Sequence, residues 1–185
     1  MSRRRDISAG LFHVTCHSVW ELDLFRDDVD RVNYLAELVR TMRRRGWICP
    51  VVCLMTTHAH FMFEIGDDSL AEGMQELNFR YAVSFNARHR RRGRVFGAPY
   101  SPTRIRDDSH LLTAYRYVVM NPVEAGLVDR PEDWRWSSYA TTIGLSQDFA
   151  FVNANRVLGA LGGPPEVARA RLRAFVEADL PVTIS

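Results

Sequence analysis

The sequence contains no lysine, so all 24 of its Lys-or-Arg positions are arginine. It has only three cysteines, Cys16, Cys49 and Cys53, which form neither a CxxC pair nor a disulfide-rich pattern. No apolar run approaches the roughly 18 residues needed to cross a bilayer. The basic N-terminal residues also lack the apolar stretch of a signal peptide. These absences exclude a disulfide-rich secreted protein and a membrane protein, and we expect a cytoplasmic protein with no membrane partner.

The length of the chain predicts one domain. Its 185 residues suffice to enclose a hydrophobic core, and no repeat or low-complexity tract divides them. We expect the main domain to span residues 1–145. A short helical tail over residues 146–185 would pack on this domain or extend it.

Arginine is concentrated in one window. The formal net charge is only +2, but the window from Arg80 to Arg106 holds eight arginines and no acidic residue. Such a band is the electrostatic footprint of a protein that binds a phosphate backbone. The run at 90–92 could equally be the solvated end of a helix. The candidate nucleic-acid-binding residues are Arg80, Arg88, Arg90, Arg91, Arg92, Arg94, Arg104 and Arg106.

Hydrophobic periodicity predicts a βαββαβ order. Period-2 alternation indicates strands, and apolar residues at 3.6-residue spacing indicate helices. In order, the elements are a strand at 11–17, a helix at 28–45, strands at 47–55 and 58–65, a helix after the N-cap Ser69, and a strand within 95–105. This order predicts an α+β fold, a ferredoxin-like sandwich with an antiparallel sheet. Two helices cover one face of such a sheet and leave the other face open.

Two histidines begin the third predicted strand. Because side chains alternate along a strand, His58, His60 and Glu64 share one face, and the opposite face is apolar. The histidines then project from the open face of the sheet. Imidazoles at this spacing can hold one divalent ion, although a bare His-x-His also occurs without a ligand. Glu64 could be an extra ligand and is left unassigned.

A third predicted helix, at 109–120, carries two tyrosines with different environments. At ~100° per residue, Tyr115 falls on the apolar stripe, whereas Tyr117 and Asn121 lie together on the other side. A phenol beside a metal ion can be deprotonated and attack as a nucleophile, forming a covalent intermediate. The structural alternative is an amphipathic helix with a half-buried tyrosine.

Several motifs, taken together and in order, resemble one protein family. They are His13-Val14-Thr15, Leu54-Met55-x-x-His58-x-His60, Phe85-Asn86-x-Arg88, Tyr117-x-x-x-Asn121-Pro122-Val123-x-Ala125-Gly126-Leu127 and Trp136-Ser137-Ser138-Tyr139. The last two are the most specific. On these motifs the chain resembles the REP-associated tyrosine transposases, which belong to the single-tyrosine HUH transposases of insertion sequences.

This resemblance implies a metal-dependent endonuclease and religase for single-stranded DNA. Tyr117 would be the nucleophile that forms a 5′-phosphotyrosine and frees a 3′-OH. His58 and His60 would be metal ligands, and Asn121 stands where related transposases have a third polar ligand, a glutamine. Mg²⁺ or Mn²⁺ is expected instead of Zn²⁺, because two imidazoles, an amide oxygen and water suit harder ions.

The resemblance also implies the architecture and the partners. The HUH domain would cover residues 1–145, with the third helix as an added catalytic helix. The substrate would be single-stranded DNA folded into REP-like palindromic hairpins, and a homodimer is left open. Thr57 departs from the family pattern, which usually has Asn there, and the segment 98–102 lacks a basic residue common in the family.

Two other functions fit parts of the sequence. The first is a non-catalytic nucleic-acid-binding module with the same sandwich. RNA-recognition domains of that type expose aromatic residues on the open face, whereas histidines are expected here. The second is a two-histidine phosphoesterase. His13-Val14-Thr15 matches one of its His-x-Thr motifs, but a second such motif is missing.

Overall fold

The computed structural model describes residues 9–66 and 68–178. The N-terminal segment on which the signal-peptide expectation rests therefore lies mostly outside the described residues. The last seven residues of the expected tail lie outside them as well. The sheet contains β1 (Gly10–His17), β2 (Ile48–Leu54), β3 (His58–Ile65) and β4 (Ser101–Arg104). Its order is β2-β3-β1-β4, and every neighbouring pair is antiparallel. This arrangement confirms the predicted ferredoxin-like α+β fold.

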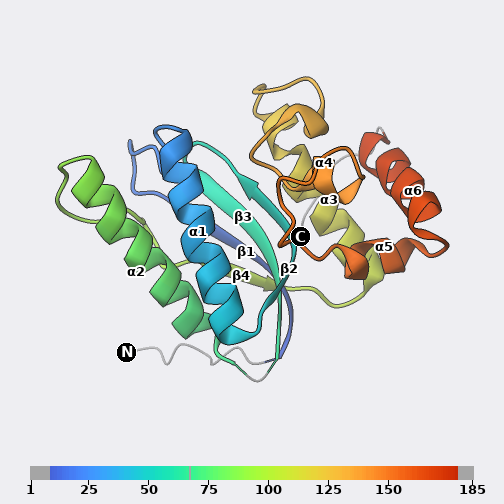
Figure 1. Cartoon of the computed structure of the whole chain (residues 1–185), viewed down its shortest axis with the longest axis horizontal. Coiled ribbons are helices and arrows are strands. Elements are labelled where there is room, and N and C mark those ends of the chain that lie inside the picture. Colours follow the sequence, from blue (N-terminus) through green and yellow to red (C-terminus); the bar gives the residue numbers. More distant parts are fainter. Residues whose placement is uncertain (1–8, 67, 179–185) are drawn as a thin grey trace.

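Two long helices, α1 (Asp28–Arg45) and α2 (Leu70–Arg88), lie side by side on one face of the sheet (Figure 1). Local capping sets their ends. The Asp27 side chain accepts a hydrogen bond from the N–H of Asp30, and Gly46 ends α1 in the left-handed conformation with φ 65°. The Ser69 side chain caps α2. These helices bury the apolar side of the strands, including Phe12, Val14, Cys16, Ala59, Phe61 and Phe63.

The second face of the sheet, expected to be open, is covered. Helix α3 (Asp108–Glu124) packs on it, followed by α4 (Tyr139–Thr142), α5 (Asn155–Leu161) and α6 (Pro165–Glu177). Figure 1 shows α3 to α6 gathered together, away from α1 and α2. The physical reason is that this face is only partly polar. Its apolar side chains, Val51, Cys53, Met55 and Met62, form a second core with Leu111, Tyr115 and Val118 of α3.

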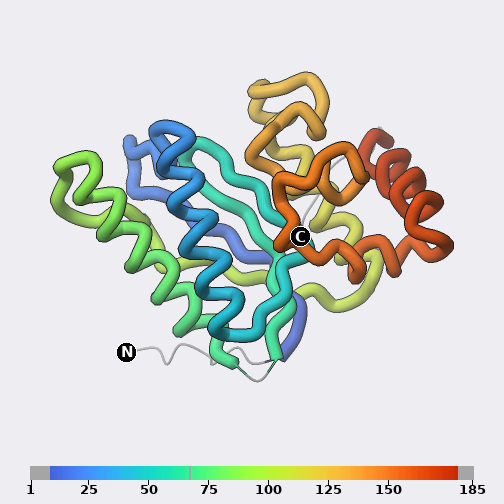
Figure 2. The backbone as a smooth tube through the Cα atoms, in the orientation of Figure 1, coloured from blue at the N-terminus to red at the C-terminus, as the bar shows by residue number. Residues whose placement is uncertain are grey.

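The motif at 136–139 has a structural role at the free edge of the sheet. The backbone N–H of Ser138 donates to the carbonyl of Val52, and the Ser138 hydroxyl accepts from the N–H of Val52. Leu54 donates to the carbonyl of Trp136. Beyond α4 the chain returns to β2, where Asn153 donates to the carbonyl of Cys49 (Figure 2). An edge strand that would otherwise expose unpaired groups is thereby protected.

The remaining elements are short. The 3-10 helix η1 (Pro131–Asp133) precedes the edge motif. Strand β4 has four residues and lies at the opposite edge, where Pro102 is tolerated because an edge strand need not donate on both sides. Helices α5 and α6 contact α3 and add Val157, Leu172 and Val176 to the second core. No helix in the described part of the chain is long and apolar enough to cross a membrane.

Candidate active site

The pairing of β1 with β3 places four histidines on the face that α3 covers. The register sets His17 opposite His58 and Thr15 opposite His60. The rings of His17 and His58 stack with centroids 4.9 Å apart, and those of His58 and His60 are nearly perpendicular at the same separation. His13 joins them because alternate residues of neighbouring strands share a face. These four imidazoles form the floor of the candidate active site.

One ring nitrogen of His60 is held by the first strand. Its Nδ1 lies 3.1 Å from Nε2 of His13 and 3.2 Å from Oγ1 of Thr15. Its Nε2 is buried and has no hydrogen-bond partner among the described residues. A buried polar atom without a partner costs about 1–3 kcal/mol. Nε2 of His60 is therefore the atom that an added ligand would satisfy.

His58 repeats this arrangement in a half-buried position. Its Nδ1 lies 3.1 Å from Oγ1 of Thr57, the residue that precedes the strand. When the Nδ1 of a histidine is hydrogen-bonded to oxygen, the Nε2 atom remains to bind a metal. Both imidazoles of the motif can present Nε2 in this way.

Tyr117 approaches the histidines from α3. Its ring centroid lies 5.5 Å from that of His60 and 5.9 Å from that of His13, with both pairs edge to face. Tyr115, two residues earlier, is fully buried in the second core. The sequence assigned the two tyrosines to opposite sides of one helix, and the structure places them so. Of the two rings, Tyr117 is the one beside the histidines.

Asn121 is one turn beyond Tyr117 on the same helix. Its amide nitrogen donates to the carbonyl of Tyr117 at 2.6 Å. Pro122 follows within the helix and cannot donate a backbone hydrogen bond. With the amide nitrogen engaged, the side-chain oxygen of Asn121 is left for a ligand role, and Asn121 lies close enough to raise the pKa of both His58 and His60. The structure thus brings together Tyr117, Asn121 and both histidines of the motif.

The electrostatics of the site favour neutral imidazoles. Burial lowers the pKa of His60 well below its ordinary value, and the neighbouring His13, His58 and His17 lower it further, while Asn121 opposes them. Burial also lowers the pKa of His58, as does His17. Because a neutral imidazole can donate a lone pair to a metal ion, this environment keeps both motif histidines in the form that can ligate.

The residues present fit a divalent ion. The donor set is two imidazole nitrogens, one of them buried without a partner, and one amide oxygen. Within residues 9–66 and 68–178, no three His, Cys, Asp or Glu side chains are grouped to hold a metal. The third protein ligand would therefore be Asn121. Glu64 is exposed, and at about 3.3 Å per residue it lies roughly 13 Å along β3 from His60.

The eight arginines of the basic band divide into two groups. Four of them bind other parts of the protein: Arg80 to Glu76, Arg88 to Asp27 and Asp30, Arg91 to Asn86, and Arg104 to the carbonyl of Ala9. The side chains of Arg90, Arg92, Arg94 and Arg106 make no ion pair or hydrogen bond with any described residue. The second group is the one whose charge is fully available to a phosphate backbone.

Sequence reasoning missed the residues that support the motif. His13 bonds to His60, and Thr15 does the same. His17 stacks on His58, and Thr57 bonds to it. The signal was available in the alternation of His13, Thr15 and His17, because the βαββαβ order makes β1 the neighbour of β3.

Comparison with known proteins gives a structural match. No protein-family model matches the chain, and neither does a curated protein. A solved structure, described as the REP-associated tyrosine transposase bound to a REP hairpin, superposes with a TM-score of 0.67. The chain has the fold of that transposase. The match covers 89% of this chain and 92% of the other at 15% sequence identity, and it confirms the resemblance at the level of the fold.

Proposed function

We propose that this protein is a metal-dependent endonuclease and religase for single-stranded DNA, a tyrosine transposase of the HUH type, and that Tyr117 is its nucleophile. The observation that carries the proposal is the edge-to-face contact of Tyr117 with His60, whose buried Nε2 has no partner. The similar transposase is bound to a REP hairpin. We therefore take hairpin DNA with a single-stranded flank as the substrate.

The reaction is a pair of phosphoryl transfers. The Tyr117 oxygen attacks the scissile phosphorus, the bond from phosphorus to the 3′ oxygen breaks, and the phenol's proton passes in net terms to that leaving oxygen. The products are a 5′-phosphotyrosine and a free 3′-OH. Attack by a 3′-OH on the phosphotyrosine reverses these steps and rejoins the strand, because the covalent bond conserves the phosphodiester energy.

The side chains around Tyr117 have distinct tasks. His58, His60 and Asn121 would hold Mg²⁺ or Mn²⁺, which when bound polarises the phosphate and stabilises developing charge. His13 positions His60 through its Nδ1 atom. The unpartnered arginines of the basic band would bind flanking phosphates. The perpendicular ring contacts hold the phenol beside the metal ligands, so that little reorganisation precedes attack.

The test is covalent capture of DNA. A 5′-labelled and a 3′-labelled version of a hairpin oligonucleotide with a single-stranded flank are incubated with the protein and Mn²⁺. We expect a denaturation-resistant adduct only with the 3′-labelled strand, because the protein stays on the 5′ end of the downstream fragment. EDTA should abolish the adduct. An adduct on the other fragment, or full activity in EDTA, would contradict the proposed chemistry.

A further inference from the structure

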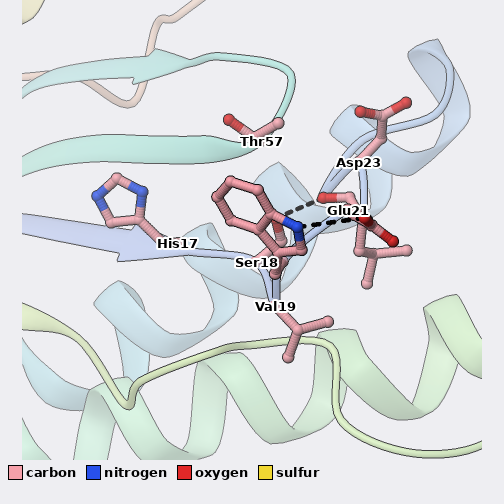
Figure 3. Close-up of a pocket in the computed structure, with 8 residues that line it drawn as sticks. His17, Ser18, Val19, Glu21, Asp23 and Thr57 are labelled. Carbon is pink, nitrogen blue, oxygen red and sulfur yellow. Dashed lines mark hydrogen bonds between the residues drawn. The ribbon is translucent and has the colours of Figure 1, made fainter.

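A second feature adjoins the histidine site. A pocket of about 440 Å³ is lined by the loop between β1 and α1, from His17 to Asp23, together with Thr57. Figure 3 shows His17 at one end of this pocket and Asp23 at the other, with Thr57 above the loop. Its volume falls within the roughly 300–1,000 Å³ typical of ligand sites. Two of its lining residues, His17 and Thr57, also contact His58, the first by ring stacking and the second by a hydrogen bond.

The most exposed large apolar side chain of this loop is Trp20, at 91% exposure. The backbone beneath it is well anchored: Ser18 donates to the carbonyl of Thr57, and Val19 donates to that of Val95. The indole Nε1 donates to the Glu21 carboxylate at 3.2 Å. The loop therefore presents a flat aromatic surface from a fixed base, which is the property of a stacking platform.

The charges around the pocket limit what can occupy it. Glu21 and Asp23 place two carboxylates on its lining, so a phosphate group is repelled. A carboxylate accepts hydrogen bonds from amino groups such as that of cytosine. Arg94 directly precedes Val95, whose carbonyl accepts from Val19, but its side chain lines a separate hollow with Gln75 and Phe96. This arrangement suits a nucleotide whose base enters the pocket while its phosphate stays outside it.

We infer that this pocket binds one unpaired base of the DNA strand, stacked on Trp20 with an exocyclic amino group toward Asp23. This inference rests on the proposed function. The centroids of His17 and His58, and of His58 and His60, are each 4.9 Å apart. The pocket therefore adjoins the candidate metal ligands, and the base that it holds belongs to the strand close to the scissile phosphate. Adenine, cytosine and guanine carry such an amino group, whereas thymine presents carbonyl oxygens on both sides of its single N–H donor.

The experiment is a double-mutant cycle that combines a substitution in the protein with removal of one base from the DNA. The flank of the hairpin DNA is scanned with single abasic sites, and affinity is measured by fluorescence anisotropy in EDTA, where no cleavage occurs. In the unmodified protein, one abasic position should weaken binding by roughly 5- to 150-fold. Trp20→Ala should weaken binding of the intact DNA by a similar factor. In this variant, removing the base at that position should cause no further loss of affinity. Trp20→Phe should retain most of the coupling.

Two further variants sharpen the result. Phe79 is an exposed aromatic on α2, 68% accessible and outside this pocket, so Phe79→Ala should bind like the unmodified protein. Asp23→Asn should reduce the preference for cytosine over thymine at the identified position. If the Trp20→Ala and abasic effects multiply independently at every position, or if Trp20→Ala binds normally, the inference is overturned.

The two proposals fail separately. If the covalent adduct forms in Mn²⁺ but the Trp20→Ala and abasic effects are additive, the base-pocket inference is overturned and the endonuclease proposal stands. If the two effects are coupled but no adduct forms, the pocket inference stands and the proposed cleavage chemistry is overturned. If the protein binds neither hairpin nor single-stranded DNA, both are overturned.

Discussion

Nδ1 of His60 lies 3.1 Å from Nε2 of His13, so a residue of the first strand orients a metal-ligand candidate of the third. With Nδ1 engaged in this way, Nε2 is the ring nitrogen of His60 that is left for a ligand. A bond of this kind typically changes metal affinity by 10- to 100-fold when it is lost. We therefore expect His13→Gln to raise the Mn²⁺ concentration needed for half-maximal cleavage by about 10- to 100-fold.

The control is a histidine of α3 that makes no contact with His60. His110→Gln should leave the Mn²⁺ dependence as it is, because among the described residues its side chain makes no hydrogen bond to His58, His60 or Asn121. Titrations of cleavage against Mn²⁺ measure both variants. An unchanged Mn²⁺ dependence in His13→Gln would show that its contact with His60 does not position the ligand.

The same residue predicts a pH dependence of stability in the metal-free protein. Burial, together with the charge of the nearby His110, lowers the pKa of His13 from 6.5 to about 4. Between these values the unfolded chain binds more protons than the folded one, so stability is fullest above pH 6.5 and falls as the pH drops through 4. The His13 contribution amounts to about 3 kcal/mol at most. Urea denaturation in EDTA at pH 7, 5.5 and 4 measures it.

The comparison for this prediction is His13→Gln, which removes the titrating group. Stability of the variant should fall less steeply with acidification, and the two proteins should converge toward pH 4. Parallel stability curves over this range would mean that His13 is solvated and titrates normally in the folded state.

The two arginine groups predict different phenotypes. Arg90 and Arg92 make no ion pair with a described residue, and each phosphate contact on a single strand contributes about 0.7 to the salt slope. Replacing both by Ala should make the slope of log K against log salt shallower by up to about 1.4, with equal loss for all sequences. Arg43→Ala, an exposed arginine at the end of α1, should leave the slope unchanged. Anisotropy titrations on hairpin and scrambled strands provide the measurement.

Arg88 lies in the same band but should act on stability. It pairs with Asp27 and with Asp30, whose buried carboxylate also contacts His89. Removing Arg88 leaves Asp30 with less compensation for its buried charge, so Arg88→Ala should lower the melting temperature. A normal melting temperature combined with a shallower salt slope would instead place Arg88 among the phosphate contacts.

Local signals in the sequence were sufficient for most of the fold. The bounds of α1 follow from the capping residue Asp27 and from Gly46, and β3 follows from strict alternation between His58 and Ile65. The separation of Tyr115 from Tyr117 needed only the 100° step of a helix. These features depend on neighbours in the sequence, which is why they could be predicted.

Long-range features could not be read in the same way. The burial of His60 depends on α3 lying over the sheet. The hydrophobic periodicity of a helix does not indicate which face of the sheet that helix will cover. The pairing of Arg88 with Asp30 joins residues 58 positions apart, so the basic band looked uniform in the sequence. Strand β4 is shorter than its predicted window because Pro99 and Pro102 limit regular pairing.

The central claim is that Tyr117 is the nucleophile, and peptide mapping of the DNA adduct tests it most directly. The protein is incubated with hairpin DNA and Mn²⁺, digested with nuclease and protease, and analysed by tandem mass spectrometry. We expect the nucleotide phosphate on Tyr117 alone, no adduct in Tyr117→Phe despite retained DNA binding, and a normal adduct in Tyr115→Phe. A nucleotide on Tyr100, Tyr115 or Tyr139, or an adduct that persists in Tyr117→Phe, would contradict the account.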